Sequence, residues 1–546
     1  HVLAFGLVDS LAKRSENLEI FRYAAGGFRD FTRIAGSDPL MWHDICLANR
    51  EAVLSVLDDF RDDLDALRNA VDTQDGHHLL GVFTRARVAR EHFSKILARR
   101  AYVDAMHDNN DLIFLAQPGG RLSGRIRVPG DKSISHRSIM LGSLAEGTTE
   151  VEGFLEGEDA LATLQAFRDM GVVIEGPQHG RVTIHGVGLH GLQPPPGPLY
   201  LGNSGTSMRL LSGLLAAQTF DTTLTGDASL SKRPMNRVAK PLREMGAVIE
   251  TAAEGRPPMV IRGGQQLRGM SYEMPMASAQ VKSCLLLAGL YAAGQTSVTE
   301  PAPTRDHTER MLRGFGYPVA VDGNVATVES GHKLSATHIE VPADISSAAF
   351  FLVAGSIAEG SELLLEHVGI NPTRTGVIDI LKLMGGDLTL ENQREVGGEP
   401  VADIRVRSAK LKGIEIPQEL VPLAIDEFPV LFVAAACAEG RTILRGAEEL
   451  RVKESDRIQV MADGLVALGV KAEPTPDGII IDGGPIGGGE VNSHGDHRIA
   501  MSFSVASLRA SGAIRIHDCA NVATSFPNFL GLAAQVGIRV SEEGKA

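Results

Sequence analysis

Residues 130–137 combine charges and hydroxyls that could together hold a phosphorylated anion. The segment reads Gly-Asp-Lys-Ser-Ile-Ser-His-Arg, so Lys132, Arg137 and two serine hydroxyls lie close together, and an apolar run begins at Ile139. A short turn opening a helix there would direct backbone N–H groups, hydroxyls and cations to one point, as anion binding requires. Taken alone, the segment could equally be a basic helix start on the surface.

Four further basic clusters follow along the chain. They are Lys232-Arg233-Pro234, Thr304-Arg305-Asp306-His307, Arg451–Arg457 and Asp496-His497-Arg498. The whole chain carries a net charge of −14, which argues against general binding to nucleic acid or to an anionic membrane. We therefore expect local cationic pockets that hold anionic ligands.

The cysteines and the apolar runs restrict the class of protein. The four cysteines lie far apart, with no Cys-x-x-Cys pair and no histidine at metal-ligand spacing; they are Cys46, Cys284, Cys437 and Cys519. We expect reduced thiols in a cytoplasmic protein, with neither metal nor cofactor. No apolar run reaches the roughly 18 residues of a membrane span, and no signal peptide is visible. Because the chain starts at His1 inside an apolar stretch, we expect a piece of a longer polypeptide.

Residues 1–106 are expected to form an all-helical domain. The spacing of an amphipathic helix is followed by Val53, Leu54, Leu57, Phe60, Leu64 and Leu67. A second helical stretch is predicted from about Leu80 to Val103. Residues 107–113 are predicted to be a linker, because they include the polar run Asp108-Asn109-Asn110-Asp111.

Residues 114–546 contain an internal repeat with a period of roughly 70 residues. Each copy predicts a small-residue helix, a Thr/Val-rich strand, and a Leu-rich helix that ends at a glycine before another strand. These glycines are Gly171, Gly246, Gly316, Gly385, Gly469 and Gly537. We expect each of them just past a helix C-terminus, in the left-handed conformation. Six such α/β units could form two lobes of three units each.

Seven motifs, in order along the chain, resemble those of the enolpyruvyl transferase family. They are Gly130-Asp131-Lys132-Ser133, Gly202-Asn203-Ser204-Gly205-Thr206, Arg233-Pro234-Met235, Ser278-Ala279-Gln280-Val281-Lys282, Asn371-Pro372-Thr373-Arg374, Arg451–Arg457 and Asp496-His497-Arg498. The resemblance covers residues 114–546 and is strongest to the 3-phosphoshikimate 1-carboxyvinyltransferases. The run Arg305-Asp306-His307-Thr308-Glu309, together with Ser278-Ala279-Gln280, resembles the class II branch of that family.

The resemblance implies a fold and a domain organisation. The fold is α/β, with two lobes built from six βαβ-type repeats, preceded here by the all-α domain. Lobe 1 would be discontinuous, comprising residues 114–131 and 343–546, and lobe 2 would comprise residues 132–342. The active site would lie in the cleft between the lobes.

The resemblance also implies a reaction. The enolpyruvyl group of phosphoenolpyruvate would move to the 5-hydroxyl of shikimate 3-phosphate, by addition and elimination through a tetrahedral intermediate, and phosphate would leave. This chemistry needs an acid for the methylene carbon, a base for the hydroxyl and cations for the anionic groups. By resemblance, Asp426 is the proton acceptor, Glu454 serves the methylene carbon, and Lys132 contacts both substrates.

Each substrate has its own set of expected contacts. Shikimate 3-phosphate is expected on Lys132, Ser133, Arg137, Ser278, Ala279, Gln280, Arg305, Asp426 and Lys453. Phosphoenolpyruvate is expected on Lys132, Gly205, Arg233, Gln280, Arg457 and Arg498. A structural alternative stays open for both carboxylates, since Asp426 could cap a helix and Glu454 could form an i,i+3 ion pair with Arg457.

Two positions bear on ligand binding in the family. Thr524 stands where class I members have a lysine, so that ligand contact is absent or supplied elsewhere. Glyphosate competes for the phosphoenolpyruvate site in this family, and alanine in place of the glycine reduces its binding. Because Gly205 leaves that room, we expect phosphoenolpyruvate-competitive inhibition by glyphosate.

Residues 1–106 resemble the C-terminal helical domain of prephenate dehydrogenase. The resemblance rests on the runs Ala24–Ala35 and Asp38–Trp42. No Gly-x-Gly-x-x-Gly loop in a βαβ setting accompanies them, so we expect no prephenate oxidation by this chain. The helical domain forms dimers in that family, which predicts a homodimer here.

Two other functions are considered. UDP-N-acetylglucosamine enolpyruvyl transferase uses a reactive cysteine in the loop before its Arg-Pro pair, whereas Gly226–Pro234 contains no cysteine. A non-catalytic module that binds phosphorylated metabolites would not need Asp426, Glu454 and the basic clamp, all of which are present.

Overall fold

The computed structural model describes residues 38–76, 78–83, 86 and 112–543. The chain divides into two compact units, one up to Val82 and one from Phe83 onward. Most of the predicted second helical stretch, and all of the predicted linker except Leu112 and Ile113, lie outside the described residues.

The N-terminal unit is helical where it is described. Helix α4 (Pro39–Ala48) begins at Asp38, whose side chain accepts a hydrogen bond from the Leu40 N–H at 2.9 Å, and proline at the first helical position suits such a start. Helix α5 (Arg50–Asp72) contains all six positions of the predicted amphipathic helix. The expected all-α character of this region is therefore confirmed for these residues.

Each repeat of the second unit has two helices. The first helices are α7 (Lys132–Leu144), α9 (Gly205–Leu215), α11 (Ala279–Gly289), α13 (Ile345–Ile357), α15 (Phe428–Cys437) and α17 (His497–Ala506). The second helices are α8 (Glu158–Asp169), α10 (Asn236–Glu244), α12 (His307–Gly314), α14 (Gly376–Leu383), α16 (Arg457–Ala467) and α18 (Phe529–Val536). All thirteen residues of α13 are buried, because a helix that is apolar on all sides must lie inside a lobe.

The strands of each repeat form a split βαβ unit. In the first repeat, β3 (Glu146–Glu152) and β4 (Val173–Gln178) flank β5 (Arg181–Val187), which is antiparallel to both. The same arrangement recurs with β7 (Thr222–Thr225), β8 (Val248–Ala252) and β9 (Arg256–Arg262); β11 (Gln295–Thr299), β12 (Ala320–Asp322) and β13 (Val325–Glu329); β15 (Glu362–Gly369), β16 (Asp387–Val396) and β17 (Glu399–Arg407); β18 (Arg441–Leu444), β19 (Lys471–Thr475) and β20 (Gly478–Asp482).

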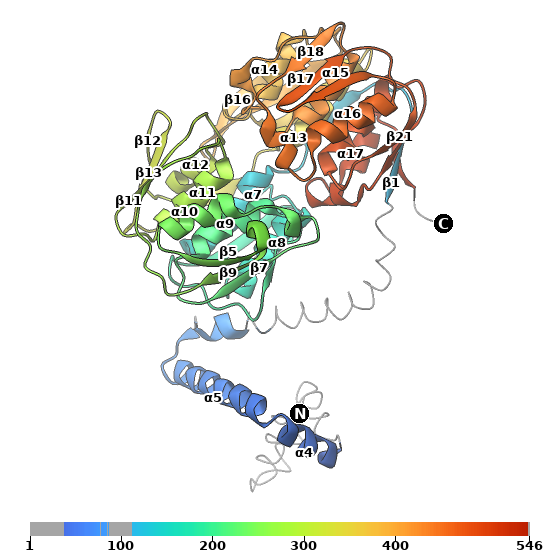
Figure 1. Cartoon of the computed structure of the whole chain (residues 1–546). Coiled ribbons are helices and arrows are strands. Elements are labelled where there is room, and N and C mark those ends of the chain that lie inside the picture. The colour runs from blue at the N-terminus through green and yellow to red at the C-terminus, as the bar shows by residue number, and fades with distance from the viewer. Residues whose placement is uncertain (1–37, 77, 84–85, 87–111, 544–546) are drawn as a thin grey trace. The chain divides into compact units, whose positions relative to one another are not determined.

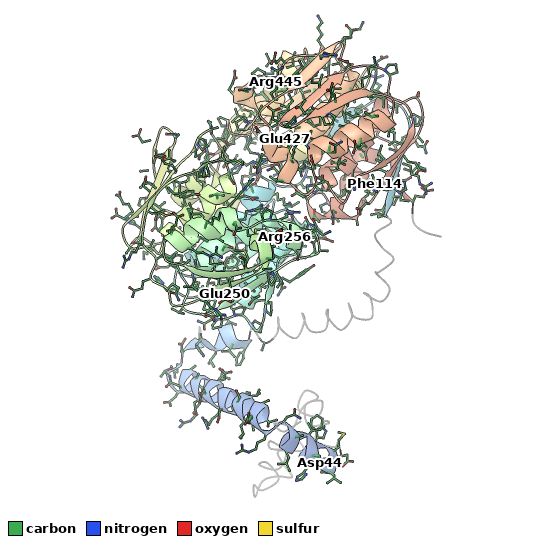
Figure 2. All side chains as sticks on the ribbon, viewed as in Figure 1. Asp44, Phe114, Glu250, Arg256, Glu427 and Arg445 are labelled. Atoms are coloured by element: carbon green, nitrogen blue, oxygen red, sulfur yellow. The ribbon has the colours of Figure 1, made fainter. Side chains whose placement is uncertain are left out.

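The sixth repeat is completed by residues from far earlier in the chain. Strand β1 (Ile113–Ala116) lies between β22 (Ile514–His517) and β23 (Val540–Glu543), antiparallel to both, with Leu115 opposite Arg515 and Ser541. Figure 1 shows β1 among the C-terminal elements, and Phe114 on it is 2 % exposed (Figure 2). Strand β2 (Ser123–Ile126) joins the fourth repeat, parallel to β15. The first two strands of the second unit therefore complete the sheets of its sixth and fourth repeats.

The six predicted glycines end the second helices as expected. Their φ angles lie between 79° and 108°, in the left-handed region that favours glycine. At Gly171 the N–H donates to the Arg168 carbonyl at 2.9 Å, and the next N–H donates to the Phe167 carbonyl at 3.0 Å. This pair of bonds recurs at all six sites and satisfies the last helical carbonyls.

The buried apolar side chains form two clusters. One gathers residues 114–128 and 343–538, and the other gathers residues 134–341. The chain passes between them through two adjacent segments, where the Asp131 N–H donates to the Pro342 carbonyl and the Asp344 N–H donates to the Pro129 carbonyl. The first cluster corresponds to the proposed lobe 1 and the second to the proposed lobe 2. The division therefore supports the proposed boundaries of the lobes.

Candidate active site

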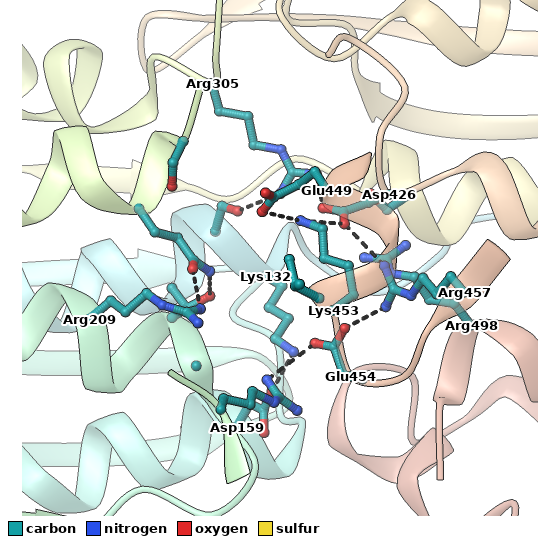
Figure 3. A pocket seen from close by; sticks show the side chains of 18 of the residues that line it. Lys132, Asp159, Arg209, Arg305, Asp426, Glu449, Lys453, Glu454, Arg457 and Arg498 are labelled. Carbon is teal, nitrogen blue, oxygen red and sulfur yellow. Dashed lines mark hydrogen bonds and ion pairs between the residues drawn. The ribbon is translucent and has the colours of Figure 1, made fainter. Parts of the chain in front are cut away.

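A cavity is lined by side chains from both lobes (Figure 3). Nine of the lining residues are cationic, namely Lys132, Arg209, Arg233, Arg237, Arg305, Arg374, Lys453, Arg457 and Arg498. Five are carboxylates, namely Asp159, Asp344, Asp426, Glu449 and Glu454. The excess of positive charge suits a ligand that carries several negative charges.

The first helices direct their N-termini at this cavity. Lys132 begins α7, Gly205 begins α9 and His497 begins α17, and all three line the cavity. Asp426 precedes α15 by two residues. Side chains cap several of these helices; the Ser204 hydroxyl, for example, accepts a hydrogen bond from the Ser207 N–H at 3.0 Å. Free N–H groups and aligned peptide dipoles at helix N-termini favour anions.

Arg457 joins the two carboxylates predicted to be catalytic. Its Nη2 lies 2.7 Å from Glu454 Oε2, and its Nη1 lies 3.3 Å from Asp426 Oδ1. Its Nε donates to Asp496 Oδ2 at 2.8 Å, which fixes the guanidinium plane. Since Arg457 is only 1 % exposed, the surrounding protein holds this fork in place beside Asp426 and Glu454 (Figure 3).

Lobe 2 supplies the cations that face these carboxylates. Arg233 Nη1 lies 3.5 Å from Glu454 Oε1, and its Nη2 donates to Asn203 Oδ1 at 2.6 Å. Arg305 reaches across the cleft to pair with Asp426 (Figure 3). The ion pairs Arg233–Glu454 and Arg305–Asp426 therefore connect the two lobes across the cleft.

Two other predicted cations differ in their surroundings. Lys453 Nζ lies 3.6 Å from Asp426 Oδ1. The Arg498 guanidinium lines the cavity without a hydrogen bond or ion pair to another described residue. Arg498 can thus bind a ligand without giving up a hydrogen bond or ion pair, while its charge helps to lower the pKa of Asp426.

Two of the residues predicted to bind substrate, Lys132 and Gln280, have side-chain partners within the protein, and two of these partners, Asp159 and Arg209, lie outside the motifs. Lys132 pairs with the buried Asp159. Gln280 accepts a hydrogen bond from Arg209 at 2.6 Å and donates to the Thr206 hydroxyl at 2.9 Å. These partners orient the side chains that would meet a substrate.

A second cavity adjoins the first. Six residues line both, namely Ser278, Gln280, Arg305, Asp426, Glu449 and Lys453. Every residue predicted for phosphoenolpyruvate lines the first cavity. All residues predicted for shikimate 3-phosphate except Arg137 line at least one of the two cavities. Ala279 lines only the second.

Arg137 lies behind the cavity wall. It is 4 % exposed, and its guanidinium donates to the Ser133 carbonyl at 2.9 Å, to the Thr308 hydroxyl at 2.7 Å and to the Ser283 hydroxyl at 2.9 Å. All three of these acceptors belong to the protein, so in this geometry Arg137 supports Ser133 rather than facing the cavity. Its predicted contact with a ligand stays a prediction.

The charges around the two carboxylates control their protonation. Burial would raise the pKa of Glu454, but the cations Arg457 and Arg233 outweigh it and hold that pKa well below its usual range. Burial acts on Asp426 in the same way, and Lys453 and Arg305 hold its pKa well below the usual range. In this geometry both groups are therefore carboxylates at neutral pH.

A third ionisable group in the cavity is neutral. Burial, with the adjacent Arg498, lowers the pKa of His497 to about 3. His497 therefore adds no charge to the site at neutral pH.

Sequence reasoning assigned no site role to six charged residues that line the cavity, namely Asp159, Arg209, Arg237, Asp344, Arg374 and Glu449. Asp159 and Glu449 lie between motifs, where no local pattern marks them, and Glu449 pairs with Arg237 at 2.9 Å. Arg209 follows Gly205 by four residues, so helical spacing could have placed the two on one face. Thr524, by contrast, is buried and donates its hydroxyl to the Asn521 carbonyl, and it does not line either cavity.

The described part of the chain contains neither a metal-ligand cluster nor a membrane-spanning helix. No group of three or more His, Cys, Asp or Glu side chains there is placed to hold a metal ion. No helix there is long and apolar enough to cross a membrane.

Comparisons with known proteins agree with this geometry. Residues 116–532 match the family described as EPSP synthase (3-phosphoshikimate 1-carboxyvinyltransferase), and residues 1–85 match the prephenate dehydrogenase dimerization domain. A 3-phosphoshikimate 1-carboxyvinyltransferase of Methylococcus capsulatus is 70 % identical over 435 residues, covering 80 % of this chain and 99 % of that protein. One of Alkalilimnicola ehrlichii is 69 % identical, covering 79 % and 98 %.

Solved structures show the same fold. The EPSP synthase of Acinetobacter baumannii is 64 % identical, with a TM-score of 0.72, and the match covers 79 % of this chain and all of that one. The enolpyruvyl transferase NikO of Streptomyces tendae shares the fold at 17 % identity, with a TM-score of 0.66. The chain belongs to the EPSP synthase family, with a prephenate dehydrogenase-type helical region at its N-terminus.

Proposed function

We propose that this chain transfers the enolpyruvyl group of phosphoenolpyruvate to the 5-hydroxyl of shikimate 3-phosphate and releases phosphate. The observation that carries the proposal is the Arg457 fork, which joins Asp426 and Glu454 at the centre of a cationic cleft. Phosphate release on mixing the two substrates with the enzyme tests it. No release, with both substrates bound, would refute it.

Phosphoenolpyruvate would bind among Lys132, Arg233, Arg457 and Arg498. Guanidinium groups bind carboxylate and phosphate oxygens through paired hydrogen bonds. Arg498 has no hydrogen bond or ion pair to give up, whereas Arg233 and Arg457 must exchange part of their contact with Glu454 for the ligand. Binding of phosphoenolpyruvate is thereby coupled to the charge state of Glu454.

This coupling explains how a carboxylate of low pKa becomes an acid. When anionic oxygens neutralise Arg457 and Arg233, the charges that depress the pKa of Glu454 are cancelled and its burial prevails. Glu454 then takes up a proton and delivers it to the methylene carbon, which becomes a methyl group. In the elimination step it removes a proton from that methyl group as phosphate leaves.

Asp426 is the proposed base for the 5-hydroxyl. As a carboxylate it can accept the hydroxyl proton while the oxygen attacks the central carbon of phosphoenolpyruvate. Its three cationic neighbours, Arg305, Lys453 and Arg457, keep it ionised and aimed at the cleft. Shikimate 3-phosphate would bind in the adjoining cavity, against Ser278, Ala279, Gln280, Arg305 and Lys453, and would reach Ser133 in the first cavity.

Glyphosate is the proposed inhibitor. Gly205 lines the cavity, and a Cβ there would lie only 3.0 Å from Arg209 Nη1 and 3.1 Å from Arg233 Nη1, so glycine leaves the room that a larger residue would take from the clamp and its ligand. We expect inhibition in the micromolar range that is competitive with phosphoenolpyruvate. Absence of inhibition at millimolar glyphosate would overturn this assignment.

Thiol chemistry separates this function from that of the UDP-N-acetylglucosamine enzyme. Burial raises the pKa of Cys437 and Cys519 to about 12, and neither residue lines the cleft. Alkylation of the native enzyme at neutral pH should therefore leave the reaction rate unchanged. Loss of activity on alkylation would favour the rival. Free thiols also support the proposal of a cytoplasmic enzyme.

The helical unit is the proposed dimer contact. The family that residues 1–85 match is described as a dimerization domain, and Leu54, Phe60 and Leu64 of α5 are 45, 38 and 48 % exposed. A second copy would cover such side chains. Light scattering should give the mass of a dimer, and a monomer mass would contradict the proposal.

A further inference from the structure

One buried arginine outside the clamp contacts both segments that connect the lobes. Arg374 is 3 % exposed and follows β15 in lobe 1. Its Nη1 donates to Asp131 Oδ2 at 2.6 Å, and its Nη2 donates to Asp344 Oδ1 at 2.9 Å. Asp131 belongs to one connecting segment and Asp344 to the other, so a single guanidinium fastens the two together.

Both carboxylates are also helix caps. Asp131 accepts a hydrogen bond from the Ile134 N–H at 2.9 Å and caps α7 in lobe 2. Asp344 accepts one from the Ser346 N–H at 2.8 Å and caps α13 in lobe 1. Arg374 therefore sets how the N-terminus of α7, which carries Lys132, stands relative to that of α13.

A further branch leads to the proposed base. Arg374 Nη2 donates to the Ser346 hydroxyl at 2.7 Å, and that hydroxyl donates to Glu427. Glu427 directly follows Asp426 and sits at the N-terminus of α15. Three helix N-termini that face the cleft thus meet at one guanidinium.

Contacts around Arg374 cross between the lobes as well. His307 of lobe 2 lies 2.7 Å from Glu399 of lobe 1, and Asn371 of lobe 1 donates to Asp306 of lobe 2 at 2.7 Å. The two motifs that contain these residues, 305–309 and 371–374, have no assigned task in the reaction except through Arg305. Their joint burial beside the connecting segments indicates a task at the hinge.

We propose that Arg374 is a positioning residue, which holds the two connecting segments in the geometry that brings Lys132 and Arg305 of lobe 2 against Asp426 and Glu454 of lobe 1. The expected loss of kcat in Arg374 variants rests on the proposed function. The expected change in the distance between the lobes, measured without ligand, does not depend on it.

The test compares Arg374→Gln with Arg405→Gln. Arg405, on β17 of the same lobe, bonds Glu391 at 2.6 Å and Glu362 at 3.1 Å, so the control also loses two ion pairs, but far from the hinge contacts. The kcat for phosphate release and the melting temperature are measured for both. Spin labels are attached to cysteines introduced as Val248→Cys in lobe 2 and Leu383→Cys in lobe 1, after Cys46 and Cys437 have been replaced by serine. The distance between the two labels is measured without ligand.

Arg374→Gln is expected to lower kcat about 10- to 100-fold, because small misplacements of catalytic groups are costly, and to widen the distribution of distances between the lobes. Arg374→Lys keeps the charge without the fork and should fall between parent and Arg374→Gln. Arg405→Gln should match the parent in kcat and distances. A lower melting temperature with parental kcat and distances in Arg374→Gln would overturn the proposal.

Two complications are separable. If Arg374→Gln does not fold, the same measurements are made on Arg374→Lys and Ser346→Ala. Values of kcat and label distances equal to those of the parent in both variants would overturn the proposal. If the parent releases no phosphate, the proposed function fails, whereas the label distances still judge the role of Arg374 at the hinge.

Discussion

Replacing Gly205 with alanine should weaken phosphoenolpyruvate binding while the fold stays intact. A Cβ at this position would lie 3.0 Å from Arg209 Nη1 and 3.1 Å from Arg233 Nη1, so both guanidinium groups must move by a few tenths of an ångström. Arg233 is held by Asn203 at 2.6 Å, and its displacement misaligns the clamp. Gly205 starts a helix, where alanine is well accepted.

The expected magnitude follows from the interaction that is strained. A hydrogen bond to a charged group contributes about 1.5–3 kcal/mol, and a partial loss of about 1–2 kcal/mol corresponds to a KM for phosphoenolpyruvate raised roughly 5- to 30-fold. By resemblance to the family, the inhibition constant for glyphosate should rise by more than this. Urea unfolding should show a free energy within about 1 kcal/mol of the parent.

The assay is phosphate release with phosphoenolpyruvate varied at saturating shikimate 3-phosphate. Gly531→Ala is the matched control, because Gly531 lies in helix α18 and no atom stands within 4 Å of its added Cβ. It should gain up to about 1 kcal/mol in stability with parental kinetics. A KM for phosphoenolpyruvate within twofold of the parent in a folded Gly205→Ala enzyme would refute the reasoning.

Two predictions concern stability. Lys282→Met should lower the free energy of unfolding by about 3–5 kcal/mol, because the 2 % exposed ammonium pairs with the buried Glu300 and Glu309; a loss below about 1 kcal/mol in urea would contradict this. Burial, with charge from Lys132, holds the pKa of His136 well below 6.5, so below that pH only the unfolded chain takes up a proton, and stability should fall with decreasing pH by up to about 1.4 kcal/mol per pH unit. His136→Gln should remove that share of the slope in urea titrations between pH 5 and 6.5, and an unchanged slope would contradict the assignment.

Local patterns in the sequence were sufficient to predict the repeats. The glycine at the end of each second helix marks a short-range requirement, since Gly171 and its counterparts need a left-handed φ and the helix before them needs its last carbonyls satisfied. Such a requirement is visible within a few residues. The insertion of β1 between β22 and β23 is not, because it depends on pairing between segments about 400 residues apart, and no local pattern encodes it.

The same distinction applies to the cleft. Motif residues such as Arg457 and Arg498 could be predicted, because several charged residues stand together in the sequence. Asp159 could not, since it becomes the partner of Lys132 only when α8 packs beside α7. The burial of Arg137 behind Ser133 was likewise invisible, because it is set by Thr308 and Ser283 on other helices.

The most direct test of the central claim is phosphate release from shikimate 3-phosphate and phosphoenolpyruvate by the parent, Glu454→Gln and Asp426→Asn enzymes, with binding of both substrates measured in parallel. The account predicts turnover by the parent and losses of at least about a hundredfold in each variant, with binding retained. Turnover without those losses would contradict the roles of Glu454 and Asp426, and a parent that binds both substrates without releasing phosphate would contradict the function itself.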